Sequence, residues 1–255
     1  MNKVIRAEFG RTINAGLIIA IAGIIFSICF DSFNDLIAGL RNGQEYVGYF
    51  FSNAAFGGMC THYMLPVFTA LPFSVSLCQE RNNKAVSYIV SREGKNRYIF
   101  AKFIVSAISG GFVAACGTVL LFLMLAMRFP IAGDEFEGAV VSDYFHEWSA
   151  VYYPQFYILT LSILAFCRGV IWSSLALCVS LYTSDFMVVL LSPFLGSYVL
   201  VRIFQIIRVP DMVRPDMILI GQVVIKSSGL TLLIAIAISL TIVTLIGAFF
   251  VGKMK

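Results

Sequence analysis

Charged residues are scarce in this chain of 255 residues. Asp, Glu, Lys and Arg make up 13% of the sequence, whereas a soluble domain usually has about 25%. Hydrophobic residues make up 59%, and the mean hydropathy is +0.88. Too few polar residues are present to cover such a chain in water, so we expect lipid to surround part of it. The net charge of +4 is too small to indicate a nucleic-acid partner.

The residues that enzymes and metal sites use are also sparse. The chain has two histidines, and a sequence that begins like the zinc motif H-E-x-x-H at His146 has Ala150 in place of the second histidine. None of the six cysteines forms a C-x-x-C pair, so we interpret them as small buried hydrophobic residues. Phosphate-binding G-x-x-x-x-G-K-[ST] and nucleophile G-x-S-x-G motifs are absent. We therefore predict no catalytic residues, no metal, no cofactor and no ATPase site in this chain.

Long apolar runs are what the sequence has instead. A helix needs about 20 apolar residues to cross a bilayer. We predict an all-α integral membrane protein, a single transmembrane domain over 1–255, with six spans. The predicted spans are about 13–30, 56–78, 103–127, 155–182, 186–201 and 229–251. The second contains Pro66 and Pro72 and should be kinked. We expect no cleavable signal, because no short apolar stretch with a small-residue cleavage site follows the polar N-terminal residues.

The basic residues predict the orientation of the chain. Six spans place both termini on one side, and most of the 18 lysines and arginines lie there. They are Lys3, Arg6, Arg11, Arg81, Lys84, Arg92, Lys95, Arg97, Lys102, Lys253 and Lys255. The positive-inside rule therefore predicts cytoplasmic termini. The external segment 202–228 is amphipathic and carries four cations, so it is a re-entrant or interfacial helix pair, a simple loop, or a seventh crossing.

Two features lie inside the predicted spans. Small residues recur every four positions in the third span, and they indicate either packing inside the bundle or a dimer contact. They are Ala107, Gly111 and Ala115, with Ser106, Gly110 and Ala114 beside them. Arg168 is the one charge inside a span, and a charge there costs about 2.5–3.5 kcal/mol on insertion scales. We interpret it as a residue of a transport pathway or a contact for an anionic group; a hydrogen bond to backbone carbonyls or a snorkelling side chain is the alternative.

The most charged stretch runs from Gln79 to Lys102, between the second and third spans. Val86, Ile89 and Val90 share one helical face, and Gly94 should end the helix. A second face carries Arg81, Lys84 and Ser87. This pattern predicts a short amphipathic helix at the cytoplasmic surface. It is either a helix lying on anionic lipid or a docking surface for a cytoplasmic partner.

In this stretch the chain resembles the permease subunits of ABC-2 type transporters. In that family an acidic residue follows the second span, and a short helix, a Ser-Arg turn and a basic start of the third span come next. The matching residues are Glu80, Ser91-Arg92, Tyr98 and Lys102. The N-terminal segment from Met1 to Arg11 is similar to the family's elbow helix, an interfacial helix before the first span. Lys84-Ala85 stands where many members have Gly-Thr.

The resemblance implies a division of labour between subunits. Two permease chains, as a homodimer, form the pathway, and a separate cytoplasmic ATP-binding subunit supplies the energy. It implies ATPase-coupling roles, which we assign to Glu80, Arg81, Lys84, Ser91 and Arg92, with Arg168 in the pathway. It also implies export of a hydrophobic or amphipathic substrate, such as a peptide, an antibiotic or a lipid, across a bacterial cytoplasmic membrane.

Two other classes of function compete with this hypothesis. A self-contained channel or secondary carrier would require several ionisable residues inside the membrane, and an intramembrane enzyme would require the residue sets that are absent. External aromatic residues would suit an amphipathic peptide, or they form an ordinary interfacial belt. They are Tyr144, Phe145, Trp148, Tyr152 and Tyr153.

Overall fold

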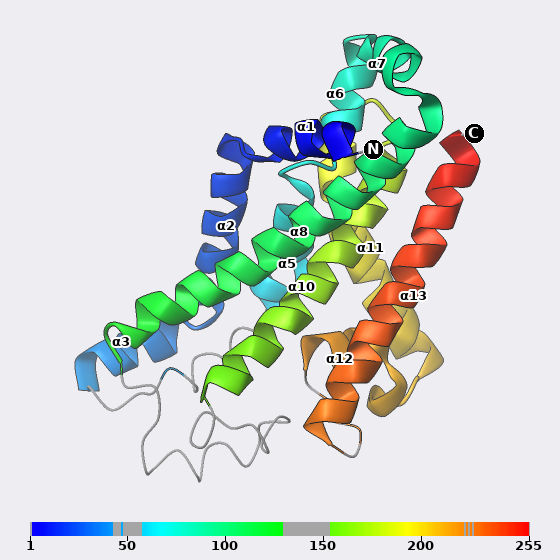
Figure 1. Cartoon of the computed structure of the whole chain (residues 1–255). Coiled ribbons are helices and arrows are strands. Elements are labelled where there is room, and N and C mark those ends of the chain that lie inside the picture. Colours follow the sequence, from blue (N-terminus) through cyan, green and yellow to red (C-terminus); the bar gives the residue numbers. More distant parts are fainter. Residues whose placement is uncertain are drawn as a thin grey trace.

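The computed structural model describes residues 2–42, 47, 58–129, 154–221, 223, 225 and 227–254. These residues form helices joined by short connections, without strands, so the all-α prediction is confirmed for them. The segment 130–153 lies outside the described residues, and it includes His146 and the aromatic residues named above. Figure 1 shows the helices as an elongated bundle with both labelled termini at the same end.

Four helices are long and apolar enough to cross a membrane. They are α8 (Lys95–Ala126), α10 (Pro154–Val179), α11 (Phe186–Ile207) and α13 (Ser228–Met254). They correspond to the last four predicted spans, although α8 and α10 end one and three residues before the predicted ends. Three are longer than predicted: α8 begins eight residues earlier, α11 ends six residues later, and α13 gains one residue at its start and three at its end. Hydropathy marks only the apolar part of a helix, whereas the helical backbone extends to its caps. Gly94 is the N-cap that limits α8 at its start, and Arg208 is the C-cap that limits α11 at its end.

The first two predicted spans are shorter or interrupted. Helix α1 (Asn2–Thr12) meets α2 (Ala15–Asp31) at a bend of 56°, and the two together form a fifth candidate span. Asn14 caps α2 by accepting a hydrogen bond from the backbone N–H of Leu17 at 3.1 Å. The second predicted span divides into α5 (Met59–Ala70) and α6 (Ser76–Asn82), with Pro72 in the break. The kink is confirmed, whereas the count of six spans stays a prediction.

Serine hydroxyls hold the break between α5 and α6 against the long helices. The Ser74 Oγ lies 3.0 Å from the Ser106 Oγ of α8 and donates to the carbonyl oxygen of Ser173 in α10 at 3.0 Å. The Ser106 hydroxyl donates to the same carbonyl at 3.2 Å. A broken helix inside a bundle needs such partners for its polar groups, because lipid offers none.

The packing of α8 on α10 forms the centre of the bundle (Figure 1). The two backbones touch where Gly110 faces Gly169: a Cβ at Gly110 would lie 2.8 Å from the Gly169 carbonyl oxygen. A Cβ at Gly111 would lie 2.7 Å from the Val170 side chain. The small residues at these two positions therefore pack inside the bundle, as the first of the two sequence-based alternatives proposed.

Short helices lie at the end of the bundle opposite the termini. Helix α3 (Phe33–Asn42) follows α2 there, and the 3₁₀ turn η4 (Asp211–Val213) and α12 (Pro215–Ile220) follow α11. Helix α12 packs on α10 and α13 and buries Ile218, Leu219 and Ile220. At six residues, α12 is far too short to cross a bilayer, so the described part of 202–228 contains no seventh crossing.

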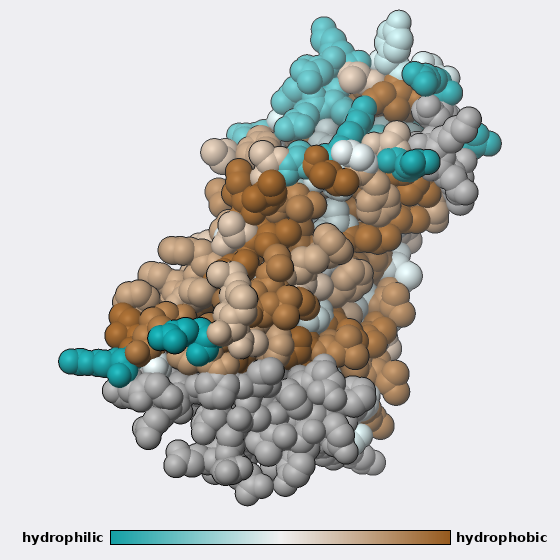
Figure 2. Space-filling model, turned by 60° about the vertical axis from the view of Figure 1, so that its left-hand side comes forward, coloured by the Kyte–Doolittle hydropathy of each residue, from teal (hydrophilic) through white to brown (hydrophobic). Residues whose placement is uncertain are grey.

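The surface of the bundle changes along its length. Figure 2 shows hydrophilic side chains gathered at the end formed by α6 and the following helix α7 (Ala85–Glu93), and a broad hydrophobic zone below it. Exposed side chains in the hydrophobic zone come from α2, α8, α11 and α13, among others; they include Ile18, Phe112, Leu123, Leu195 and Leu240. This distribution suits a protein whose middle part lies in lipid.

Candidate functional site

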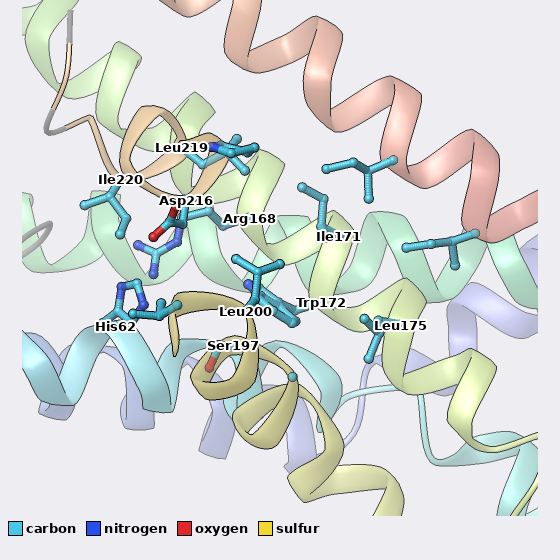
Figure 3. A pocket seen from close by; sticks show the side chains of 15 residues that line it. His62, Arg168, Ile171, Trp172, Leu175, Ser197, Leu200, Asp216, Leu219 and Ile220 are labelled. Atoms are coloured by element: carbon cyan, nitrogen blue, oxygen red, sulfur yellow. The ribbon is translucent and has the colours of Figure 1, made fainter. Parts of the chain in front are cut away.

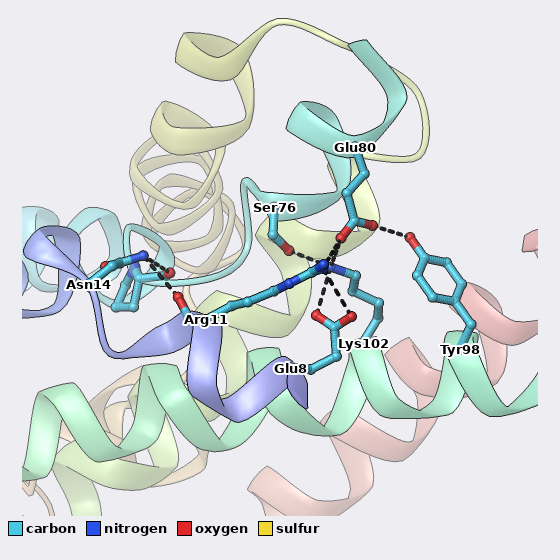
Figure 4. Close-up of polar contacts among 8 residues, drawn as sticks. Glu8, Arg11, Asn14, Ser76, Glu80, Tyr98 and Lys102 are labelled. Atoms are coloured by element: carbon cyan, nitrogen blue, oxygen red, sulfur yellow. Dashed lines mark hydrogen bonds and ion pairs between the residues drawn. The ribbon is translucent and has the colours of Figure 1, made fainter. Parts of the chain in front are cut away.

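Four charged side chains converge at the end that carries the termini (Figure 4). The Glu80 carboxylate of α6 forms two ion pairs through its Oε1 atom. One is with Lys102 Nζ of α8 at 2.7 Å and the other with Arg11 Nη1 of α1 at 2.6 Å. Its other oxygen, Oε2, accepts a hydrogen bond from the Tyr98 hydroxyl at 2.5 Å. Glu8 of α1 contacts both cations: its Oε1 lies 3.2 Å from Arg11 Nη1, and its Oε2 lies 3.1 Å from Lys102 Nζ. We call Glu8, Arg11, Glu80 and Lys102 the four-charge cluster.

The four-charge cluster is mostly buried. Lys102 is 0% exposed and Glu80 8% exposed, while the Arg11 side chain is 53% exposed at its edge. The Lys102 ammonium also donates to the Ser76 hydroxyl at 3.1 Å and lies 4.6 Å from the centre of the Phe73 ring. Two carboxylates and two cations balance in charge, so each buried ion has an opposite partner.

These contacts tie three separate segments into one unit. Helix α1 precedes the first predicted span, α6 ends the second, and α8 contains the third. A displacement of α6 would therefore act on α1 and α8 through charged contacts. The sequence pointed to Glu80 but not to the cluster, because sequence distance hides the pairing. A usable signal existed in Lys102, a lysine directly before a long apolar run, and in Glu8 three residues before Arg11.

Helix α7 is the predicted amphipathic helix. Its apolar residues Val86, Ile89 and Val90 pack against a core that includes Leu77 and Ile99. The opposite face is open, and Tyr88 is 82% exposed. Residues with positive φ lie at both ends of the helix, Lys84 at φ 54° and Gly94 at φ 84°, so sharp turns separate α7 from α6 and α8. The short amphipathic helix and its end at Gly94 are confirmed, whereas the predicted polar face is divided: Arg81 lies on α6 and Lys84 in the turn before α7.

The five predicted coupling residues fall into three environments. Glu80 is buried in the four-charge cluster. Arg81 donates to the carbonyl oxygens of Ser180 at 3.0 Å and Leu181 at 2.8 Å, and so satisfies backbone acceptors at the end of α10. The remaining three are exposed: Lys84 directly before α7, and Ser91 and Arg92 in its last turn.

Asn82 adds a further link to the turn between α10 and α11 by donating to the Ser184 carbonyl oxygen at 3.1 Å. Together with Arg81, it fixes the α6–α7 corner on that turn, although neither the resemblance nor the pattern indicated this contact. The corner is thus tied to α10 as well as to α8.

Arg168 is not part of the four-charge cluster and lies on α10, close to the midpoint of the helix. It lines a cavity of about 160 Å³ together with His62 of α5 and Asp216 of α12 (Figure 3). The structure therefore brings two further ionisable side chains to the one intramembrane charge that the sequence indicated. Among the described residues, no group of three His, Cys, Asp or Glu side chains could hold a metal ion.

The chain was compared with protein families, curated proteins and solved structures. No family model, no curated protein and no solved structure matches the chain.

Proposed function

We propose that this chain is the membrane-spanning permease subunit of an ATP-driven exporter, energised by a separate cytoplasmic ATPase that docks on α7. In this proposal the chain crosses the membrane six times, with α1 as an interfacial elbow helix and α7 and both termini in the cytoplasm. The substrate is a hydrophobic or amphipathic molecule. A second permease chain, most simply an identical one, completes the pathway.

The observation that supports the proposal is the orientation of α7 on the bundle. Its apolar face is packed on the ends of the long helices while its polar face stays exposed. A helix that merely covered lipid would turn its apolar residues outward to the bilayer. Here the exposed face offers Ser87, Tyr88 and Ser91, a polar surface of the kind that a soluble partner recognises.

The four-charge cluster would carry a movement of α7 into the spans. Helix α7 follows α6 directly, and α6 contributes Glu80 to α1 and α8 through ion pairs. In this scheme Glu80 does not touch the ATPase. It acts as a positioning residue inside the chain, and so does Arg81, while Lys84, Ser91 and Arg92 remain candidates for direct contact.

The low burial of α11 and α13 leaves room for a second chain. In α11 and α13 only 22% and 17% of the most apolar stretch of the helix is buried, compared with 50% in α8 and 67% in α10. Such helices contact either lipid or another protein chain. A dimer of permease chains would cover part of this surface.

The test is purification of the complex in mild detergent from cells that express the chain. We expect an ATPase with a phosphate-binding loop to co-purify in equal amounts. The double substitution Tyr88→Ala and Arg92→Glu on the exposed face of α7 should reduce that recovery at least tenfold, without loss of the chain itself. Met212→Ala, which changes an exposed residue at the opposite end, is the matched control.

A self-contained secondary carrier is the second candidate, and one observation favours it. His62, Arg168 and Asp216 meet at one cavity, whereas the sequence indicated a single charge at membrane depth. Ionisable side chains near the middle of a bundle are typical of carriers. If the purified chain alone moves substrate in liposomes without nucleotide, the exporter proposal fails and the carrier stands.

A further inference from the structure

The cavity beside Arg168 has mostly apolar walls. It lies between α10, α11, α12 and α13, with the side chains that Figure 3 labels around it. Trp172, Leu175, Leu200 and Leu219 are among its apolar residues. Arg168 is 4% exposed and lines this cavity.

Arg168 has no hydrogen-bond or ion-pair partner among the described residues. The nearby acid is Asp216, but its carboxylate is held by another cation. Arg214 donates to it from Nη2 to Oδ2 at 2.7 Å and from Nε to Oδ1 at 3.3 Å. These two bonds also raise the pKa of the Arg214 guanidinium, which therefore stays charged. Arg214 also pairs with Asp211 at 3.1 Å. Asp216 is thus bound by Arg214, and Arg168 is left without a direct counter-ion in the part of the chain that the structure describes.

A buried cation without a counter-ion is unfavourable in lipid, and a bound anion offsets that cost. A guanidinium suits carboxylate and phosphate oxygens best, because its N–H groups match them in pairs. The charge of Arg168 therefore favours an anionic group, and the apolar walls of the cavity favour an apolar chain attached to that group.

The volume limits how much of a ligand fits inside. Cavities of about 150 Å³ hold a group the size of benzene, so 160 Å³ accepts a head group and the first few carbons of a chain. The rest of the chain must lie outside. Helices α11 and α13 each pack on α10 without packing substantially on each other, and both expose apolar side chains such as Leu195 and Leu245.

We propose that this cavity binds the carboxylate or phosphate head group of a membrane-dissolved amphiphile. Arg168 contacts the anion, and the apolar chain of the ligand lies between α11 and α13. This inference does not rest on the proposed exporter function, because the chain alone can be assayed for binding, and failure of either leaves the other intact.

Trp172 provides a local probe of the site. The chain has two tryptophans, and Trp148→Phe leaves Trp172 as the single emitter. The protein is reconstituted in phosphatidylcholine vesicles with an acyl-brominated lipid at equal mole fraction in each arm: phosphatidylglycerol, phosphatidylcholine or a free fatty acid. We expect the anionic probes to quench Trp172 with about tenfold higher affinity than the zwitterionic one, as a charged hydrogen bond provides.

Substitutions then assign the preference to Arg168. Arg168→Gln should abolish it and Arg168→Lys should retain part of it, whereas Arg202→Gln, which removes an exposed cation of α11, should leave it unchanged. Stronger quenching by the fatty acid or by phosphatidylglycerol identifies the source of the head group. Equal quenching by anionic and zwitterionic lipids would overturn the proposal, and so would a preference that survives Arg168→Gln. The comparison of lipids is decisive even if that variant does not fold.

Discussion

Lys102 illustrates how much one side chain can hold together. Its ammonium contacts Glu8, Glu80 and the Ser76 hydroxyl, and so joins α1, α6 and α8 at a single atom. Because the side chain is 0% exposed, none of these contacts can be replaced by water. Arg11 contacts the same two carboxylates, but with its side chain 53% exposed it is partly screened.

We therefore expect Lys102→Met to be strongly destabilising. The substitution leaves two buried carboxylates without their buried cation, and such a loss costs about 3–5 kcal/mol. The free energy of unfolding in detergent, or the thermal midpoint, measures it. The double variant Lys102→Met with Glu80→Gln should recover part of the loss, because it removes the charge left uncompensated.

Arg11→Met is the matched control for this experiment, since its ion pairs lie at the exposed edge and should contribute at most about 1 kcal/mol. Equal losses from Lys102→Met and Arg11→Met would contradict the assignment of Lys102 as the central ion.

At the scale of elements, the crossing of α8 and α10 depends on the absence of side chains. Gly110 and Gly169 let the two backbones touch, and the Ser74–Ser106–Ser173 contacts lie beside the crossing. No hydrophobic effect drives helices together in lipid, so van der Waals packing at such a close contact stabilises the pair instead. The break between α5 and α6 is held by the same region.

Gly110→Ala should separate these helices. The new Cβ would overlap the Ser173 side chain and lie 2.8 Å from the Gly169 carbonyl oxygen. Overpacking of this kind costs about 1–3 kcal/mol, seen as a lower thermal midpoint in detergent.

Gly252→Ala in α13 is the control, because nothing lies within 4 Å of its added Cβ. Alanine favours a helix over glycine by about 1 kcal/mol, so this variant should be neutral or slightly stabilised. If Gly110→Ala behaves like Gly252→Ala, the two helices do not depend on this close contact.

At the scale of the whole molecule, the proposed topology places α7 and η4 on opposite sides of the membrane. Both labelled termini and α7 lie at one end in Figure 1, and the segment with η4 and α12 lies at the other. The hydrophilic end in Figure 2 is the end of α6 and α7. Positive charge in that region predicts that it is cytoplasmic.

Cysteine labelling checks this topology. In a background that lacks the native cysteines, Met212→Cys should react with an impermeant maleimide in intact cells, because Met212 is 70% exposed in η4. Ser91→Cys on α7 should react only after the membrane is opened. Labelling of both in intact cells, or the reverse order, would refute six crossings with cytoplasmic termini.

The sequence by itself determined the properties that follow from local hydropathy and backbone preference. Apolar runs predicted the helical class and the last four long helices, Pro66 and Pro72 predicted a kink in the second span, and Gly94 predicted the end of α7. The chain stays helical at Pro66 and breaks at Pro72. Each depends on neighbours along the chain. Only the tertiary structure decided which charges meet. Glu8, Glu80 and Lys102 are far apart in sequence, as are His62, Arg168 and Asp216, and helix packing alone brings each set together.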